Sequence, residues 1–324
     1  MLDRQGREIH YLRMSVTDRC NLRCRYCMSE EGVNWLLKQE LLSDEQFARL
    51  ARLLAGLGVD KVRLTGGEPL LRQGLDRLVG MLRDIDGLHT LALTTNGVLL
   101  EEQLPALVKA GLNEVNVSLD TLDRTQYAKI ARRDALPQAL AGLRAAVETP
   151  GLVVKVNCVP IGENDEQLVP LASLAEGGGV TVRFIELMPL GLGASLQRRT
   201  ERQVLERLEA AYGPARPAEE SGRAGPARYV TFPGFKGKVG FISALSHRFC
   251  SGCNRVRLTA AGFLKTCLQY EKGIDLKPLL NAGAQDADIF AAIQEAIWEK
   301  PQGHHFGTPP AGGDERRNMN EIGG

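Results

Sequence analysis

The chain has 324 residues, a hydrophobic content of 44% and a formal net charge of +1. This length can bury one large core or a core with an extension, and the low charge argues against bulk nucleic-acid binding. No apolar run approaches the roughly 20 residues that a membrane-spanning helix needs, and residues 1–10 have no signal-peptide pattern. We therefore expect a cytoplasmic protein that binds neither nucleic acid nor membrane.

Strands and helices alternate along the first two thirds of the chain. Short β-branched runs predict six strands, at residues 10–17, 59–65, 90–96, 114–120, 153–159 and 180–187. Amphipathic stretches between them predict helices, including 44–57, 75–82, 101–110 and 137–147. Six strand-helix units predict an α/β fold with a parallel sheet, curled into an incomplete (β/α)6 barrel of the TIM type. A flat, doubly wound sheet is the alternative.

Three of the seven cysteines follow the first predicted strand closely, at Cys20, Cys24 and Cys27. The stretch is too tight for three separate disulfides or a regular zinc finger, whereas three thiolates on one loop can hold three irons of a [4Fe-4S] cluster. The fourth iron would then have no protein ligand. Because a small molecule can coordinate an open iron and receive an electron there, the spacing indicates redox chemistry.

The early strands have one aliphatic face and one polar face, since successive side chains point to opposite sides of a strand. Four cations lie on the polar faces, namely Arg13, Lys61, Arg63 and Lys155. A barrel packed only for stability fills its interior with branched apolar side chains, so this lining implies a ligand. Buried cations need anions, and few acids lie on the same faces, so we predict a phosphate-bearing substrate. The alternative is that some of these cations lie at strand ends in water.

The last third of the chain has a different character. A helix is predicted over 203–212, and a stretch rich in Pro, Gly and Ala follows it. We predict a barrel domain of residues 1–213, a linker of residues 214–227 and an extension of residues 228–324. The extension has hairpin-like alternation, a terminal helix over 286–299 and a Gly-Gly tail.

A second group of three cysteines lies in the extension, at Cys250, Cys253 and Cys267. A Cys-x2-Cys pair with a third cysteine is typical of zinc, whose site would be completed here by His247 or another group. The alternative is a second [4Fe-4S] cluster. The first cysteine group favours this alternative, because it also supplies only three ligands. Arg255 and Arg257 occupy alternate positions beside these cysteines, so they share one strand face where they can bind phosphate. The alternative is a basic edge strand exposed to water.

Three motifs in this order resemble those of the radical S-adenosylmethionine (SAM) enzymes. They are the first cysteine group with Tyr26 before its last member, Gly66-Gly67-Glu68-Pro69 after the second strand, and Thr95-Asn96-Gly97 after the third. The sequence is further similar, over essentially its whole length, to the GTP 3′,8-cyclase family of molybdenum-cofactor (molybdopterin) biosynthesis. That similarity includes residues 11–20, 183–186 and 253–257 and the ending Gly323-Gly324.

The resemblance implies a lyase that opens this pathway with two [4Fe-4S] clusters and SAM. A 5′-deoxyadenosyl radical made from SAM would remove the hydrogen from C3′ of GTP. The C3′ radical would then attack C8 and give (8S)-3′,8-cyclo-7,8-dihydroguanosine 5′-triphosphate. The alternatives are another radical SAM enzyme with an auxiliary cluster, such as a peptide-modifying maturase, and a noncatalytic iron-sulfur electron carrier.

The resemblance also implies roles for particular residues. The two cysteine groups would hold the two clusters. The implied SAM-binding residues are Tyr26, Gly66, Gly67, Glu68, Asn96, Ser118 and Met188. The implied or plausible GTP-binding residues are Arg13, Lys61, Arg63, Thr94, Lys155, Arg183, Arg255 and Arg257, of which Arg13, Arg255 and Arg257 are expected to be catalytic. Met188 and Arg183 have opposite strand parity, so both can face the site only if the strand ends or bulges between them.

Further partners are implied in the same way. A reductant of unknown identity would supply electrons, and the product would pass to cyclic pyranopterin monophosphate synthase. A monomer and a homodimer both remain open, as does the order in which SAM and GTP bind. We also expect the Gly323-Gly324 tail to reach the active site and to order Arg13 or the substrate.

Overall fold

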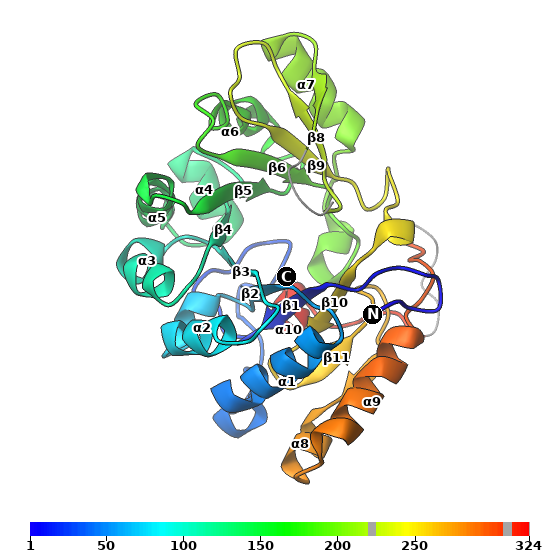
Figure 1. The fold of residues 1–324 in the computed structure, drawn as a ribbon. Helices are drawn as coiled ribbons and strands as arrows, with labels where there is room; N and C mark the ends of the chain where they lie inside the picture. The colour runs from blue at the N-terminus through cyan, green and yellow to red at the C-terminus, as the bar shows by residue number, and fades with distance from the viewer. Residues whose placement is uncertain (220–224, 307–312, 324) are drawn as a thin grey trace.

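The computed structural model describes residues 1–219, 225–306 and 313–323. Within them, the six predicted strands pair in parallel and in sequential order, which confirms this part of the prediction. Figure 1 shows these strands along an arc. They are β1 (Tyr11–Ser15), β2 (Lys61–Thr65), β3 (Thr90–Thr95), β4 (Glu114–Ser118), β5 (Val153–Cys158) and β6 (Thr181–Ile185).

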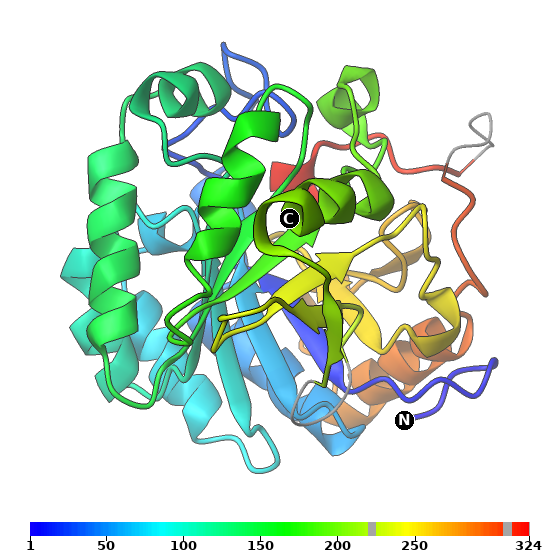
Figure 2. The ribbon, with the colours of Figure 1, turned by 90° about the horizontal axis from the view of Figure 1, so that it is seen from above.

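Helices cover the outer side of this arc, and Figure 2 shows them from above around the strands. The four helices predicted between the strands are present, and two shorter ones, α4 and α6, were not predicted. None of the helices among the described residues is both long enough and apolar enough to cross a bilayer. The outer helices are α1 (Asp44–Gly56), α2 (Leu75–Arg83), α3 (Leu100–Lys109), α4 (Arg124–Ala131), α5 (Leu136–Glu148), α6 (Leu168–Ser173) and α7 (Glu201–Tyr212).

The aliphatic strand faces pack against these helices. Leu12, Met14, Val62 and Leu64 are completely buried and belong to one large core cluster, which also includes Phe47 of α1. Full burial of such a side chain contributes roughly 1.5–3 kcal/mol, so this face fixes the orientation of each strand. Because side chains alternate, the polar residues of the same strands must face the inner side of the arc.

The C-terminal extension continues the same sheet at both ends. On one side β10 (Arg255–Leu258) pairs in parallel with β1, followed by antiparallel β11 (Phe263–Lys265) and β12 (Gly273–Asp275). On the other side β9 (Val239–Ile242) pairs in parallel with β6, followed by β8 (Arg228–Thr231) and β7 (Arg216–Ala218). Within the part of the chain that the structure describes, the sheet therefore ends in β12 and β7, and these two strands do not pair.

The boundary of the extension is less sharp than the sequence suggested. Strand β7 lies inside the predicted linker, where Pro217 is tolerated because the strand is at the edge of the sheet. Residues 220–224 of that linker lie outside the described residues. After β12 the chain forms α8 (Lys277–Asn281) and α9 (Asp286–Trp298), and α10 (Met319–Ile322) ends the described part. Figure 1 shows α10 beside β1 and β10.

Close packing between α5 and the turn after β3 leads to a stability prediction. A Cβ added to Gly142 would lie 2.3 Å from the carbonyl oxygen of Gly97, so Gly142→Ala must push the helix away from the turn. We expect a loss of about 1–3 kcal/mol, seen as a lower melting temperature. Gly80→Ala in α2 is the matched control, because a Cβ there meets no atom within 4 Å and should stabilise the helix slightly. Equal melting temperatures for the two variants would contradict this packing.

Candidate functional site

A cavity of about 340 Å³ lies on the inner side of the parallel strands, and the loops after the carboxyl ends of β1 and β2 form part of its wall. All six predicted cluster ligands line it, and each is partly exposed. The first cysteine group follows β1, and the second lies before β10 and after β11, so the pairing of β1 with β10 brings the two groups to one cavity. The predicted residues that share its wall are Arg13, Tyr26, Gly66, Gly67, Glu68, Thr94, Asn96, Ser118, Met188, Arg255 and Arg257.

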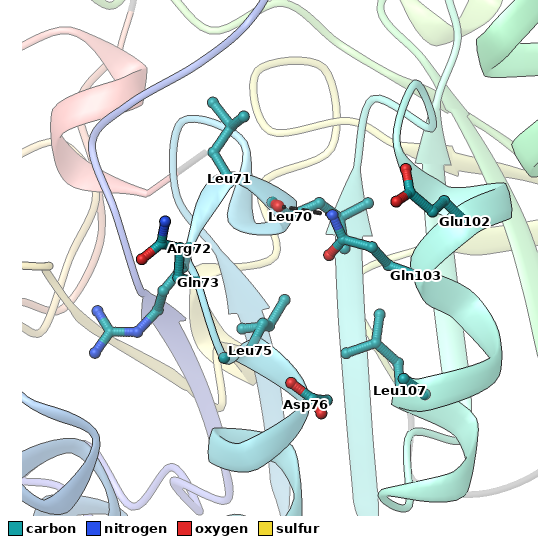
Figure 3. A pocket seen from close by; sticks show the side chains of 11 residues that line it. Leu70, Leu71, Arg72, Gln73, Leu75, Asp76, Glu102, Gln103 and Leu107 are labelled. Atoms are coloured by element: carbon teal, nitrogen blue, oxygen red, sulfur yellow. Dashed lines mark hydrogen bonds between the residues drawn. The ribbon is translucent and has the colours of Figure 1, made fainter.

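A second hollow of about 420 Å³ lies on the outer side of the sheet, between η2 (Pro69–Leu71), α2 and α3. Figure 3 shows its wall, where the Gln103 side-chain amide donates to the carbonyl oxygen of Leu70 at 3.1 Å. None of the predicted site residues lines this hollow. We therefore place the functional site in the inner cavity.

The first cysteine group fits a polynuclear cluster better than a single ion. Burial raises the pKa of Cys20 to about 11 and that of Cys27 to about 12, and it raises the pKa of Cys24 well above its usual value. Metal ligation needs thiolates, so these groups would ionise only beside the positive charge of bound iron. Over the described ranges, no three His, Cys, Asp or Glu side chains are grouped to hold one metal ion. A cube spreads its thiolates over different irons and has no such requirement.

A short helix that was not predicted positions the first cysteine loop. The backbone N–H of Arg23 donates to the carbonyl oxygen of Ala131 at 2.9 Å, and that of Arg25 donates to Ile130 at 3.1 Å. Both acceptors lie at the end of α4. The loop then turns on itself, because the N–H of Cys27 donates to the carbonyl oxygen of Cys24. These bonds fix the spacing of the three thiols without using their sulfur atoms.

The second cysteine group has a different electrostatic environment. Burial alone would raise the pKa of Cys253, but Lys300 and Arg255 lower it to about 6. His247 does not complete a zinc site there, because its side chain is 72% exposed and its Nδ1 lies 3.4 Å from Glu201 Oε2. Lys300, by contrast, is buried in the cavity wall, where its Nζ donates to the carbonyl oxygen of Arg255 at 2.8 Å. A cation held beside these cysteines favours thiolate ligands.

The Gly66-Gly67 pair permits close packing of two loops. A Cβ on Gly66 would lie 2.4 Å from the carbonyl oxygen of Thr17, and one on Gly67 would lie 2.4 Å from those of Asp18 and Arg19. The N–H of Gly67 donates to Thr17 at 2.8 Å. The glycines therefore let the loop after β2 lie directly on the segment that leads to Cys20. Their backbone also lines the cavity, where a ligand can approach it closely.

Glu68 ties these loops together. Its buried carboxylate accepts hydrogen bonds from Leu70 N at 3.1 Å, Thr95 Oγ1 at 2.7 Å and Asn96 N at 2.7 Å. The Asn96 side chain donates in turn to Asn21 Oδ1 of the cysteine loop at 2.8 Å. Burial outweighs these bonds and raises the pKa of Glu68 to about 7. Most of the acceptor capacity of Glu68 is thus used within the protein, and the predicted contact with the SAM amino group stays a prediction.

Asp120 is a site residue that sequence reasoning missed. Its Oδ2 accepts from the Tyr26 hydroxyl at 2.7 Å and its Oδ1 from Val159 N at 2.8 Å, and burial raises its pKa to about 6. The pair joins the first cysteine loop to the end of β4, where Ser118 also lines the cavity. The alternation of β4 placed Asp120 on the polar face, but sequence spacing carried no sign of its partner.

His304 is another missed residue. It lines the cavity beside the second cysteine group, and its ring centroid lies 4.7 Å from that of Phe306. The sequence indicated a tail segment rich in Gly and Pro, which gave no reason to place an imidazole in the site. The neighbouring His305 is not among the lining residues, and its Nε2 lies 3.1 Å from Asp314 Oδ1.

Three arginines of the predicted GTP site line the cavity side by side. Arg13 of β1 is the register partner of Arg257 in β10, and the guanidinium of Arg255 lies 4.9 Å from the ring centroid of Phe249. Burial, together with the charges of Arg63 and Arg255, lowers the pKa of Arg13 to about 10. Like charges that are held in neighbouring positions favour a bound anion. This part of the lumen agrees with a phosphate-bearing substrate.

The cations Lys61, Arg63 and Lys155 are not among the residues that line the cavity, and they surround an acid instead. Lys61 Nζ lies 2.6 Å from Glu114 Oε2, and Arg63 Nη2 and Lys155 Nζ lie 2.5 and 3.4 Å from Glu114 Oε1. Burial alone would raise the pKa of Glu114, but the three cations hold it far below its usual value. The expectation that few acids share the polar faces missed this residue. Glu114 is the first residue of β4, and its place among these cations depends on strand register.

Of the residues on β5, on β6 and just after β6, some line the cavity and others do not. Arg183 does not line the cavity, and its Nε and Nη2 donate to Asn157 Oδ1 at 3.0 and 2.7 Å. Asn157 itself lies on the wall. Strand β6 ends at Ile185, so Met188 reaches the cavity from the segment that follows, as its parity required.

The C-terminal tail reaches this site. The carbonyl oxygen of Gly323 accepts a hydrogen bond from Arg257 Nη1 at 2.7 Å, and a Cβ on Gly323 would lie 2.9 Å from Ser15 Cβ. The tail therefore contacts Arg257, whereas its expected effect on Arg13 stays a prediction. The last residue, Gly324, lies outside the described residues.

The fold and the cysteine loop together define a radical SAM protein. The family model described as Radical SAM superfamily matches residues 14–175, and that described as Molybdenum Cofactor Synthesis C matches residues 180–306. A crystal structure of Streptococcus suis SuiB is similar with a TM-score of 0.61, covering 91% of this chain and 67% of that one. At 15% identity, this likeness shows the fold alone.

Comparison with named relatives identifies the family within the radical SAM proteins. The chain is 46% identical to GTP 3′,8-cyclase of Pelotomaculum thermopropionicum and 43% identical to that of Heliobacterium modesticaldum, in both cases over 100% of each chain. It is 42% identical to molybdenum cofactor biosynthesis protein 1 of Bos taurus, over 94% of this chain and 48% of that protein. The chain belongs to the GTP 3′,8-cyclase family.

Removing one cysteine of the first group tests the metal assignment. Cys24→Ala should lower the iron content of anaerobically prepared protein by about half, because one of two four-iron clusters is lost. Iron and sulfide analysis measures the loss. Cys158→Ala is the matched control, since Cys158 is a fully buried thiol outside both groups and should keep its iron. Full iron content in Cys24→Ala would exclude this ligand set.

Tyr11 should ionise near neutral pH. Its hydroxyl accepts from Arg63 Nε, and burial alone would raise its pKa, but Arg63, Arg13 and Lys61 lower it to about 7. Between pH 6 and about 8 the wild type should therefore gain phenolate absorbance that Tyr11→Phe lacks. A difference spectrum of the two proteins removes the absorbance of other groups. A pH-independent difference over this range would show that the cations do not act on the phenol.

Proposed function

We propose that the chain converts GTP into (8S)-3′,8-cyclo-7,8-dihydroguanosine 5′-triphosphate, the first step of molybdenum-cofactor biosynthesis. Membership of the GTP 3′,8-cyclase family over the whole chain supports this activity. The observation that carries it is one cavity that holds both cysteine groups together with Arg13, Arg255 and Arg257. Electron-transfer groups and anion-binding groups thus share one cavity.

When bound, the cluster on the first cysteine group would supply the electron that cleaves SAM into methionine and a 5′-deoxyadenosyl radical. The surrounding residues hold the loops in place. Glu68 and Asn96 join the loops after β1, β2 and β3. The hydrogen bond between Tyr26 and Asp120 connects the first cysteine loop to the segment after β4 as well. Such fixed loops keep reacting atoms close and keep water out, which a radical reaction requires.

The three arginines and the second cysteine group would bind the substrate. Guanidinium groups bind phosphate oxygens through paired N–H donors, so Arg13 and Arg257 suit the triphosphate. In the reaction the hydrogen of C3′ passes to the 5′-carbon of the adenosyl group, and a bond forms between C3′ and C8. The dihydro product then needs one electron and one proton on the purine. Including SAM cleavage, each turnover takes two electrons from the reductant.

The proposal extends to the surroundings of the enzyme. An electron donor of unidentified kind supplies both electrons, and the product passes to cyclic pyranopterin monophosphate synthase. The enzyme acts in the cytoplasm, as a monomer or a homodimer. Nothing in the site favours a peptide-modifying maturase, because the likeness to SuiB lies in the fold and a peptide gives no use for a wall of arginines.

An anaerobic assay with SAM, reductant and GTP tests this activity. GTP labelled with deuterium at C3′ should give 5′-deoxyadenosine that carries about one deuterium per molecule, together with a cyclised nucleotide. Mass spectrometry measures both products. ATP is the control substrate, since it has the same triphosphate and a different base, and it should give neither. If 5′-deoxyadenosine forms at the same rate without GTP and carries no deuterium, the proposed function is wrong.

A further inference from the structure

Two buried cations hold the backbone around the second cysteine group. Lys300 follows α9 and is 3% exposed, and its Nζ donates to the carbonyl oxygens of Arg255 at 2.8 Å and of Thr266. Arg7 is 6% exposed, and its Nη1 donates to the carbonyl oxygen of Cys250 at 3.0 Å. Arg255 lies two residues after one cysteine of the group, and Thr266 immediately precedes another. The backbone at all three cysteines is therefore anchored to a buried cation.

The two cations differ in how their charge is balanced. Arg7 Nε lies 2.6 Å from Asp3 Oδ2, and both side chains are buried, so this pair is neutral. Among the described residues, no carboxylate pairs with the Lys300 ammonium, and both of its acceptors are backbone carbonyls. One of its three N–H donors thus has no acceptor in the described ranges. Because Lys300 lines the cavity together with the cysteines, its charge and this donor are available to an anionic group bound there.

The segment that carries Lys300 packs directly on the second cysteine group. A Cβ on Gly303 would lie 3.3 Å from Cys250 Cβ and 3.5 Å from its Sγ. Arg7 donates to the carbonyl oxygens of Gln302 at 3.0 Å and of Pro301 at 2.7 Å. These contacts fix the segment, so the ammonium is held in one place beside the cysteines. Burial also removes the water that would otherwise screen its charge.

The first cysteine group has the opposite electrostatic surroundings. Burial raises the pKa of its three thiols, and the charges of Glu68, Asp120 and Glu321 raise the pKa further. At the second group, burial alone would raise the pKa of the Cys253 thiol, but nearby cations, Lys300 first among them, lower it. Carboxylates thus lie near one group and an unbalanced cation lies near the other.

This difference in surroundings acts on the electron affinity of the two clusters. Reduction adds one negative charge to an iron-sulfur cluster. A cation held nearby stabilises the reduced form and raises the reduction potential, whereas a carboxylate lowers it. An N–H donor directed at the cluster sulfurs acts in the same direction as the cation. The effect is strong in a buried site, because the dielectric constant there is low.

We propose that Lys300 raises the reduction potential of the second cluster above that of the first, so that an electron entering the protein settles at the second cysteine group. The inference goes beyond the proposed function, because it concerns the protein without SAM or GTP and rests only on the two clusters. The first cluster then remains the stronger reductant, as the cleavage of SAM requires. Lys300 thereby gives the two cysteine groups of one cavity different electronic properties.

Lys300→Gln tests this inference, because it removes the charge and keeps an amide that can donate to the same carbonyls. Both clusters are titrated anaerobically without SAM or GTP, and electron paramagnetic resonance follows their reduced forms. At a fixed potential, the ratio of reduced to oxidised second cluster should fall at least about tenfold, a shift of about 59 mV for one electron. The ratio for the first cluster should change less than about threefold. Lys300→Arg, which keeps the charge, should stay within about threefold of the wild type.

Two further variants make the measurement specific. Cys24→Ala protein identifies the signal of the second cluster, since it lacks a ligand of the first. Lys272→Gln is the matched control, because Lys272 also follows the second cysteine group, but its side chain is 58% exposed and water screens its charge. Its removal should change the ratio for the second cluster less than about twofold.

Three results would overturn the inference. The first is a wild-type second cluster that takes up its electron at a lower potential than the first cluster does. The second is a Lys300→Gln protein that keeps all its iron and titrates as the wild type does. The third is loss of the second cluster's iron from Lys300→Gln, which would show that Lys300 only holds the loops. None of these results depends on GTP turnover, so the proposed function is tested separately.

Discussion

Three guanidinium groups lie next to one another on the inner face of the sheet, and their mutual repulsion governs what surrounds them. Parallel pairing of β10, β1 and β2 puts Arg257, Arg13 and Arg63 in one row. The strands cannot avoid this register, because the aliphatic residues between the arginines are buried against the helices. Their positive charge must therefore be balanced from the inner side. The arginines find acceptors there: the Gly323 carbonyl for Arg257, Tyr11 for both Arg13 and Arg63, and Glu114 in addition for Arg63.

The same pairing of β1 with β10 unites the two halves of the site. Without it, the loop after β1 and the loop before β10 would belong to separate parts of a long chain. The tail strengthens the connection, because Glu315 is bound by the fully buried Lys265 of β11 and by Arg317 at 2.9 Å. This anchor lies just before α10, so Gly323 enters the site from a fixed point. Chain segments more than 200 residues apart thus become one wall through backbone pairing and one buried ion pair.

Sequence periodicity predicted much of this structure. The two-residue alternation assigned the outward faces of β1, β2, β4 and β5 and identified Arg13, Lys61, Arg63 and Lys155 as inward residues, and the burial pattern agrees. The cysteine spacing led to both groups that line the cavity. These features are local, since they depend on the period of a strand or the length of a loop. They could be derived without knowing which strands are neighbours.

The features that were missed depend on neighbours. The contact between Glu114 and Arg63 depends on a row that Arg63, Ala92 and Glu114 share, and no pattern within β4 reveals that row. The division of the extension between both ends of the sheet was missed for the same reason, since β9 and β10 are joined in sequence but pair with β6 and β1. His304 and Lys300 enter the wall from segments whose composition indicated only a helix end and a tail. Register and strand order are tertiary properties, and local propensity does not encode them.

The two cysteine groups lie at opposite ends of the inner face. The first follows the carboxyl end of β1, whereas the second lies before β10 and after the antiparallel β11, at the amino ends of the parallel strands. Arg13 and Arg257 share one row between these ends, and Glu114 with its cations lies near the start of β2 and β4. A molecule that occupies the cavity between the two groups therefore meets guanidinium groups along its length, and this positive lining favours an anion there.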